Sequence, residues 1–169
     1  SVSVGEFNAS KPLVFELMSL YPDHKIVITT TTMTGSKAVK NHYNGNVIHY
    51  FFPFDAGLIM KSFLGAIKPE ICILMETEIW PNLIHLLNKK NIPVALINAR
   101  LSEKSFNKYQ RFFPKLVSKS LSKLSIICPQ NTYSADRFIK LGAKKEDLLI
   151  TGSLKFDNND SIDTDLIKS

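Results

Sequence analysis

Two carboxylates, the only tryptophan and a proline follow an apolar run in the segment Met75–Asn82, which reads Met-Glu-Thr-Glu-Ile-Trp-Pro-Asn. An apolar run such as Ile71–Met75 is typical of a parallel strand covered on both faces. Because ligands of parallel sheets bind beyond the carboxyl ends of the strands, Glu76 and Glu78 stand where a site would form. The alternative is a strand end with two solvated acids and a tryptophan that fills the seam between helix and sheet. The pattern alone does not separate the two interpretations.

A third carboxylate, Glu6, follows Gly5 at the predicted start of a helix. The positive end of the helix dipole favours its ionised form. An ionised carboxylate that faces a cleft is a competent general base for removing a hydroxyl proton. A first-turn acid that only complements the dipole has the same sequence signature, so this interpretation also stays open.

The segment Thr34-Gly35-Ser36 is the predicted start of another helix. Backbone N–H groups at such a position can bind a phosphate, although a Ser or Thr that caps the helix looks identical in sequence. The chain contains neither a Walker loop nor a GxGxxG fingerprint, which excludes the common nucleotide-binding signatures.

Composition describes one globular domain: the chain has 169 residues, of which 44% are hydrophobic, and a net charge of +6. The positive charge favours anionic partners, but without an RNP-like motif or a Cys/His finger we do not expect nucleic acid. Cys72 and Cys128 lie in apolar runs typical of buried free thiols. The four histidines are scattered without ligand spacing, so no metal site is predicted. No apolar run approaches the roughly 20 residues that span a bilayer.

Strands and helices are predicted to alternate along the chain. The predicted strands cover residues 2–4, 25–32, 47–51, 71–75, 92–98, 125–128 and 148–151. The predicted helices cover residues 6–20, 34–43, 56–67, 80–90 and 132–141, with a longer helical region from 103 to 124 that Pro114 divides. This alternation predicts an α/β fold with a Rossmann-like parallel sheet flanked by helices on both faces. Residues 1–157 form the predicted domain, and the polar residues 158–169 are a predicted linker.

Polar residues follow successive predicted strands, and a parallel sheet would bring them to one edge. They are Gly5-Glu6, Thr31 to Ser36, Asp55, Glu76 to Glu78, Asn98 with Arg100, Gln130, and Gly152 to Lys155. Basic residues also recur every three or four positions in the helical region around Pro114. They are Lys104, Lys108, Arg111, Lys115, Lys119 and Lys123. Such a stripe is usually a solvated face, but with this net charge it also fits an anionic membrane surface.

Five motifs in this order resemble those of the bacterial 3-deoxy-D-manno-octulosonic acid (Kdo) transferases of lipopolysaccharide synthesis. They are Ser-Val-Gly-Glu (3–6), Thr-Gly-Ser (34–36), Met-Glu-Thr-Glu-Ile-Trp-Pro-Asn (75–82), Asn-Ala-Arg-Leu-Ser (98–102) and Gly-Ser-Leu-Lys-Phe-Asp (152–157). The resemblance implies the N-terminal, acceptor-binding half of a GT-B glycosyltransferase. We therefore expect a fragment of a longer enzyme, inactive alone, that lacks a preceding membrane anchor, the start of the first strand and a donor domain.

The resemblance implies transfer of Kdo from CMP-Kdo to a lipid A precursor (lipid IVA) with inversion and without metal or cofactor. The reaction would take place at the cytoplasmic face of the inner membrane. By position in the motifs, Glu6 is the expected proton acceptor, and Glu76 and Lys155 are the expected transition-state stabilisers. Ser153 stands where many relatives carry asparagine, which puts that one contact in doubt.

The residues expected to bind the acceptor come from the same motifs, and CMP-Kdo is expected to bind mainly to the absent C-terminal domain. The expected acceptor-binding residues are Gly5, Thr34, Gly35, Ser36, Glu78 and Arg100. The alternative function is a non-catalytic Rossmann-like binding or regulatory module with a basic membrane- or phosphate-binding face. A receiver-like module would require paired acids after its first strand and a lysine after its fifth, a set that this sequence does not supply.

Overall fold

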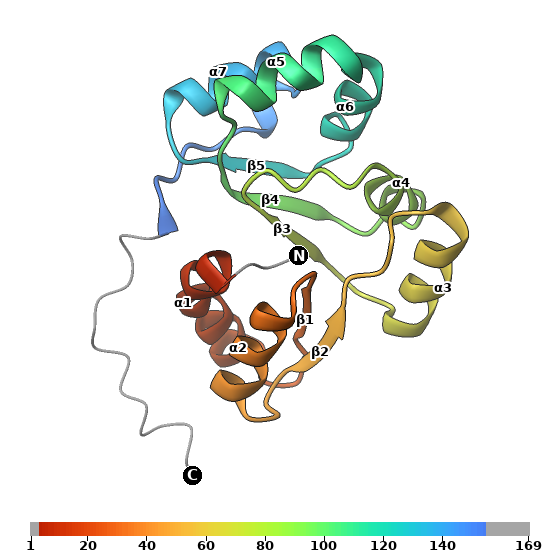
Figure 1. Ribbon diagram of the computed structural model, residues 1–169, viewed down its shortest axis with the longest axis vertical. Coiled ribbons are helices and arrows are strands. Elements are labelled where there is room, and N and C mark those ends of the chain that lie inside the picture. The colour runs from red at the N-terminus through yellow and green to blue at the C-terminus, as the bar shows by residue number, and fades with distance from the viewer. Residues whose placement is uncertain (1–3, 155–169) are drawn as a thin grey trace.

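The computed structural model describes residues 4–154, in which helices and parallel strands alternate (Figure 1). The helices are α1 (Val4–Leu20), α2 (Met33–Tyr43), α3 (Gly57–Ile67), α4 (Pro81–Lys89), α5 (Glu103–Phe112), α6 (Pro114–Leu121) and α7 (Thr132–Lys140), followed by the 3-10 turn η1 (Lys145–Asp147). The strands are β1 (Val27–Thr30), β2 (Ile48–Phe51), β3 (Cys72–Met75), β4 (Val94–Ala99) and β5 (Ile126–Pro129). The predicted α/β class is confirmed.

The strands of residues 4–154 form two parallel sheets rather than the one continuous sheet that was predicted. One sheet has the order β1-β2 and the other the order β3-β4-β5. In the larger sheet Met75 pairs with Ile97, and the register between β4 and β5 shifts between Leu96 and Ala99. The shift leaves one extra residue on β4, so the end of this strand bulges.

Two predicted strands differ in the structure. Val4 belongs to α1, so the strand predicted over residues 2–4 is wrong at this residue, and the remaining two positions lie outside the described residues. Gly5 and Glu6 likewise belong to the first turn of α1 rather than to a turn before it. The β propensity of a single valine is a weak preference that its context overrides.

The strand predicted over residues 148–151 is reduced to one bridge between Leu148 and Ile127. The N–H of Leu149 donates to the Ile127 carbonyl at 2.9 Å, and the N–H of Thr151 donates to the Pro129 carbonyl at 3.2 Å. A parallel ladder also requires donors from β5, and Pro129 has no N–H to donate. The ladder therefore stops after one bridge.

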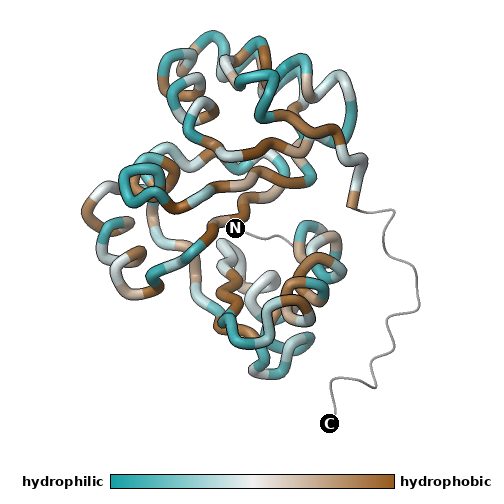
Figure 2. The backbone as a smooth tube through the Cα atoms, turned by 180° about the vertical axis from the view of Figure 1, so that it is seen from behind, coloured by the Kyte–Doolittle hydropathy of each residue, from teal (hydrophilic) through white to brown (hydrophobic). Residues whose placement is uncertain are grey.

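Each sheet has its own hydrophobic core. The smaller core joins α1 and α2 to β1 through Phe7, Val14, Ile28, Val39 and Tyr43. The larger core joins α3, α4, α6 and α7 to β3, β4 and β5, with fully buried residues that include Met60, Ile84, Leu87, Leu96, Ile127 and Phe138. Figure 2, in which the tube is coloured by residue hydropathy, shows the corresponding run of hydrophobic residues through the larger sheet. This rigid core positions the loops that follow β3 and β4.

Candidate functional site

The carboxyl ends of β3 and β4 lie side by side, and each carries a residue in the left-handed backbone region. Glu76 has a φ of 55° and Asn98 a φ of 49°. The N–H of Glu76 donates to the Ile97 carbonyl at 3.0 Å, and the N–H of Arg100 donates to the Glu76 carbonyl at 3.4 Å. Left-handed residues other than glycine are strained and concentrate at functional sites. We call this part of the molecule the carboxyl edge.

A pocket of about 200 Å³ opens at the carboxyl edge. It is lined by Glu76, Thr77, Arg100, Ser102 and Ser105. Two residues predicted from separate motifs, Glu76 and Arg100, therefore share one pocket. The volume is below the roughly 300 Å³ at which pockets for drug-sized ligands begin, so the pocket can hold one polar group of a larger molecule.

The start of α5 forms one wall of this pocket. Ser102 caps the helix by accepting a hydrogen bond from the N–H of Ser105 at 3.2 Å, and the two hydroxyl oxygens are 3.1 Å apart. The positive end of a helix, the Arg100 side chain and two hydroxyl groups favour a ligand that carries negative charge. Glu76 adds an acceptor for a hydroxyl or ammonium group. Thr77 was predicted to lie at this edge but not to bind a ligand. Ser102 and Ser105 were not predicted as site residues, although Ser102 ends the Asn-Ala-Arg-Leu-Ser motif.

Glu78 and Trp80 hold the loop after β3. The indole N–H of Trp80 donates to the Glu78 carboxylate at 3.3 Å, and the Trp80 ring packs 4.7 Å from the Phe52 ring. The geometry supports the interpretation of Trp80 as a side chain that fills the seam between helix and sheet. Glu78 does not line the pocket, and its contact to acceptor stays a prediction.

Asp55 follows β2 and caps α4. Its carboxylate accepts hydrogen bonds from the N–H groups of Asn82 at 3.0 Å and Leu83 at 2.9 Å. The residue before α4, Trp80, makes no side-chain cap of its own. The polar residue predicted after β2 therefore has a structural role at the start of α4.

Glu6 lies half-buried in the first turn of α1, and Gly5 beside it is exposed. Thr34, Gly35 and Ser36 lie in the first turn of α2, where the N–H of Gly35 donates to the Thr32 hydroxyl at 3.1 Å. The cap of α2 is thus Thr32, two residues before the segment that was predicted to start the helix, and neither Thr34 nor Ser36 is the cap. None of these residues lines the pocket at the carboxyl edge, and their acceptor-binding roles stay predictions.

Lys155, one of the expected catalytic residues, lies outside the described residues, as does the linker of residues 158–169. The segment that leads to Lys155 is described as far as Leu154, whose N–H donates to the Asn98 side-chain oxygen at 3.2 Å. The Asn98 side-chain oxygen also accepts a hydrogen bond from the Gln130 side-chain amide at 2.8 Å. The sequence placed both Asn98 and Gln130 after strands but did not indicate that they meet.

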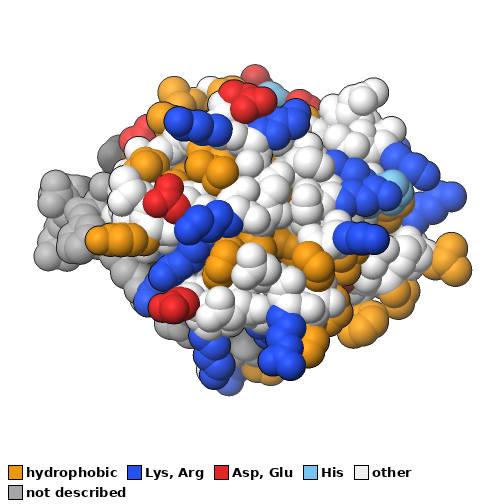
Figure 3. Space-filling model, turned by 90° about the horizontal axis from the view of Figure 1, so that it is seen from above, with side chains coloured by type: hydrophobic (Ala, Val, Ile, Leu, Met, Phe, Trp, Pro, Cys, Tyr) orange, Lys and Arg blue, Asp and Glu red, His pale blue; other side chains and the backbone are white. Residues whose placement is uncertain are grey.

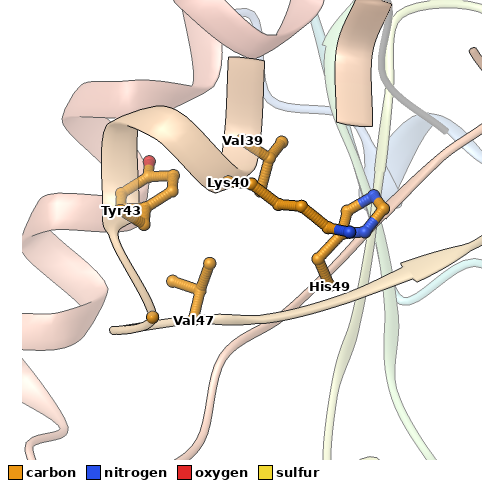
Figure 4. Close-up of a pocket in the computed structure, with 6 residues that line it drawn as sticks. Val39, Lys40, Tyr43, Val47 and His49 are labelled. Carbon is orange, nitrogen blue, oxygen red and sulfur yellow. The ribbon is translucent and has the colours of Figure 1, made fainter. Parts of the chain in front are cut away.

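A second hollow, of about 180 Å³, lies between the end of α2 and β2 (Figure 4). Figure 4 shows Lys40 extended towards the His49 ring. Burial and the Lys40 charge lower the pKa of His49, and its Nε2 lies 2.9 Å from the Thr30 hydroxyl oxygen. Gly45 and Val47, which precede β2, also line this hollow. None of the predicted site residues lines it.

The predicted basic stripe is divided, because Pro114 ends α5 and begins α6. Figure 3, which views the molecule from above, shows Lys and Arg side chains gathered around one histidine, with hydrophobic side chains exposed nearby. On α4, the His85 Nδ1 lies 2.6 Å from the Lys123 ammonium. The charges of Lys123 first, then burial, Lys89 and Lys119, lower the pKa of His85.

Both cysteines are free thiols, as predicted, but only Cys128 is buried and Cys72 is half-buried. Burial raises the pKa of both thiols, that of Cys72 to about 11. Among the described residues no three His, Cys, Asp or Glu side chains gather in an arrangement that could hold a metal ion. None of the helices within residues 4–154 is long and apolar enough to cross a membrane.

Comparison with known sequences identifies relatives over nearly the whole chain. A family model described as 3-deoxy-D-manno-octulosonic-acid transferase (kdotransferase) matches residues 1–158. A 3-deoxy-D-manno-octulosonic acid transferase of Haemophilus influenzae is 43% identical over 94% of this chain and 37% of its own length. A probable mitochondrial 3-deoxy-D-manno-octulosonic acid transferase of Arabidopsis thaliana is 39% identical over 92% of this chain and 35% of its own length. The chain thus spans little more than a third of these relatives.

Comparison with solved structures supports the fold. A UDP-N-acetylglucosamine 2-epimerase superposes with a TM-score of 0.60 and 18% identity, over 86% of this chain and 42% of that one. At this identity the likeness concerns the fold alone. It agrees with the predicted Rossmann-like fold.

Proposed function

The chain belongs to the 3-deoxy-D-manno-octulosonic acid (Kdo) transferase family, and on this premise we propose that it forms the acceptor-binding half of a Kdo transferase. The donor is CMP-Kdo, the acceptor is a lipid A precursor such as lipid IVA, and the donor binds mainly to a further domain. The observation that carries the proposal is the pocket that joins Glu76 and Arg100 across the strained ends of β3 and β4.

The pocket has the charge pattern that a phosphorylated sugar requires. Arg100, the start of α5 and the hydroxyls of Ser102 and Ser105 suit a phosphate or carboxylate, while Glu76 accepts hydrogen bonds from a sugar hydroxyl or supports a developing positive charge. Since the pocket holds about 200 Å³, it takes one group of the glycolipid and leaves the rest to the surrounding surface.

The transfer itself is a single displacement at the anomeric carbon of Kdo. The acceptor hydroxyl oxygen forms a bond to this carbon, and the bond between the carbon and the CMP phosphate oxygen breaks with its electron pair. Glu6 takes the hydroxyl proton, and Lys155 neutralises charge on the departing phosphate. The place of Glu6 in the first turn of α1 favours the ionised form that a base requires.

The role of Glu76 is tested in the full-length enzyme by Glu76→Gln, with Glu70→Gln, at an exposed acid before the same strand, as the matched control. We expect kcat to fall by about a hundredfold or more for Glu76→Gln, a loss within the usual range for a transition-state contact. Glu70 precedes β3, at the end of the strand opposite the carboxyl edge, so Glu70→Gln is expected to stay close to the native rate. Native kcat in Glu76→Gln would overturn the assignment.

The role of Glu6 is tested by Glu6→Ala and Glu6→Gln, with Glu16→Gln on the exposed face of the same helix as the control. Both changes at Glu6 are expected to abolish transfer while circular dichroism and the unfolding midpoint stay native. Transfer of radiolabelled Kdo to lipid IVA at a near-normal rate by Glu6→Ala would eliminate the general-base role.

We also place the domain on an anionic membrane, at the cytoplasmic face of the inner membrane. At the corner between α5 and α6, Arg111 stacks 5.4 Å from the Phe112 ring, and Phe112, Phe113 and Leu116 are 61%, 49% and 50% exposed. Basic and aromatic side chains that alternate in this way are typical of interfacial surfaces. The basic side chains of this corner would attract anionic lipid headgroups, and its exposed apolar side chains could insert into the membrane interface.

Vesicle sedimentation tests this surface. Reversing the charges of Lys108, Arg111, Lys115 and Lys119 is expected to weaken binding to vesicles that contain phosphatidylglycerol and to leave binding to neutral phosphatidylcholine vesicles unchanged. The control reverses the same number of charges at exposed lysines on other elements, namely Lys25, Lys37, Lys40 and Lys61. If both sets of changes act equally, only net charge matters, and the corner has no special role.

A further inference from the structure

Asn98 is buried in a left-handed backbone conformation that glycine adopts with less strain. It is 1% exposed, has a φ of 49°, and lies where the register between β4 and β5 shifts. A left-handed residue in a bulge is most often glycine, because glycine has no Cβ to strain. The side chain of Asn98 must therefore contribute something that its backbone conformation does not require.

The side-chain oxygen of Asn98 is the meeting point of three segments. It accepts hydrogen bonds from the Gln130 amide at 2.8 Å and from the N–H of Leu154 at 3.2 Å. The Gln130 amide also donates to the Asn98 carbonyl at 3.1 Å. Because both partners are donors, the Asn98 amide can only be oriented with its oxygen towards them. Gln130 thus fixes the rotamer that receives Leu154.

The segment from Thr151 to Leu154 is attached to the larger sheet at two points. The N–H of Thr151 donates to the Pro129 carbonyl at 3.2 Å, and Gly152, with a φ of 83°, turns the chain before Leu154 reaches Asn98. The next residue in the sequence is Lys155. A lysine that acts on a phosphate depends on where its backbone starts, since its long side chain is flexible.

The Asn98 side-chain nitrogen is buried without a hydrogen-bond partner among the described residues. Buried donors are normally paired, and an exception in a native structure calls for a reason. Replacing Asn98 by glycine would remove this cost together with the strain. That the amide is present despite both penalties is consistent with a requirement for its oxygen.

We propose that Asn98, oriented by Gln130, is a positioning residue that anchors the Gly152–Leu154 segment at the carboxyl edge, and that the role proposed for Lys155 depends on this anchor. The anchor acts at the carboxyl end of β4, two residues before Arg100 of the pocket. The link to Lys155 rests on the proposed function, whereas the anchor itself rests only on the hydrogen bonds.

The first experiment measures amide hydrogen exchange in the full-length protein, which does not depend on activity. Asn98→Gly keeps the left-handed backbone and removes the side chain, so exchange at Leu154 is expected to rise by about tenfold or more. Asn91→Gly is the matched control, because Asn91 also has a positive φ, of 56°, but lies in the exposed turn after α4. Native exchange at Leu154 in Asn98→Gly would overturn the anchor.

A second variant distinguishes loss of the anchor from misfolding of the protein. Gln130→Ala leaves Asn98 in place but removes the group that orients it, and is expected to raise exchange at Leu154 while the unfolding midpoint stays near the native value. Protection retained at Leu154 in this variant would contradict the role of Gln130.

The kinetic experiment separates positioning from general structure. We expect Asn98→Gly to lower kcat by about tenfold or more while the KM for lipid acceptor changes by less than about twofold. In a Lys155→Ala background the same substitution is expected to change kcat by less than about twofold, because its effect passes through Lys155. A full effect in that background would disprove the link.

The two parts of the proposal fail in different ways. If Lys155→Ala alone retains native kcat, the catalytic role assigned to Lys155 in the proposed function is wrong, and the exchange data still decide whether Asn98 is an anchor. If exchange at Leu154 is native while Lys155→Ala has a strongly reduced but measurable kcat, the proposed function stands and the anchor is wrong.

Discussion

The Asp55 carboxylate accepts a hydrogen bond from the N–H of Leu83, which is 28 residues further along the chain, at 2.9 Å. A second bond from the N–H of Asn82 at 3.0 Å completes the cap of α4. The loop after β2 is therefore fastened to the start of the helix that follows the Glu76 loop. The cap holds one side of the carboxyl edge in place.

Asp55→Ala is expected to lower the free energy of unfolding by about 1–2 kcal/mol, since two helix N–H groups lose their acceptor. Urea unfolding measures the change. Asp55→Asn retains one side-chain oxygen and should lose less. Asp136→Ala, on the exposed face of α7, is the control and should stay within about 0.5 kcal/mol of the native protein. Equal stability of Asp55→Ala and Asp136→Ala would refute the cap.

Lys123→Met is expected to raise the pKa of His85, because the Lys123 charge is the largest cause that lowers it. The remaining influence of burial, Lys89 and Lys119 keeps it below the ordinary value. A proton NMR titration of the His85 ring measures the shift. Lys61→Met on α3 is the control and should leave the titration unchanged.

The same shift predicts how stability depends on pH. Since the pKa of His85 is lower in the folded protein than in the unfolded chain, the unfolded chain binds the proton first as pH falls. Stability from this group is therefore lost as pH falls from about 6.5 towards the folded pKa. The loss should be smaller in Lys123→Met. An unchanged pH dependence would show that Lys123 does not act on His85 in solution.

Gly142→Ala is expected to destabilise the protein by more than about 1 kcal/mol. Gly142 has a φ of 102°, and an added Cβ would collide with the side chain and backbone of Ser118. Gly65→Ala is the matched opposite, because a Cβ in that turn of α3 meets nothing within 4 Å. It should raise stability by about 0.5–1 kcal/mol. Thermal unfolding of both variants checks the opposite signs.

Tyr43→Phe is expected to leave stability unchanged or to raise it by up to about 1 kcal/mol. The Tyr43 side chain is 4% exposed, its hydroxyl has no partner among the described residues, and burial raises its pKa to about 12. Tyr133→Phe, at a side chain 74% exposed, serves as the control. A loss above about 1 kcal/mol for Tyr43→Phe alone would reveal a hydrogen bond to the hydroxyl.

Local patterns predicted most elements within a residue or two. Pro81 begins α4 and Pro114 separates α5 from α6 because a proline in the first helical turn gives up no hydrogen bond. The strand predicted at residues 148–151 is reduced to one bridge because its partner β5 ends in Pro129, which has no N–H to donate. This reason is visible only once the pairing of the two segments is known. The strand prediction at Val4 was wrong because the β propensity of one valine is a weak signal.

The sequence by itself determined the order of strands and helices and which acids follow each strand, because hydrophobic periodicity and turn residues act over a few positions. Only the tertiary structure decided the partners of these polar residues. It brought Glu76 and Arg100 into one pocket, gave Asp55 to α4 as its cap, and joined Asn98 to Leu154. Such hydrogen bonds join segments 28 and 56 residues apart, and packing of the cores rather than local pattern brings them together.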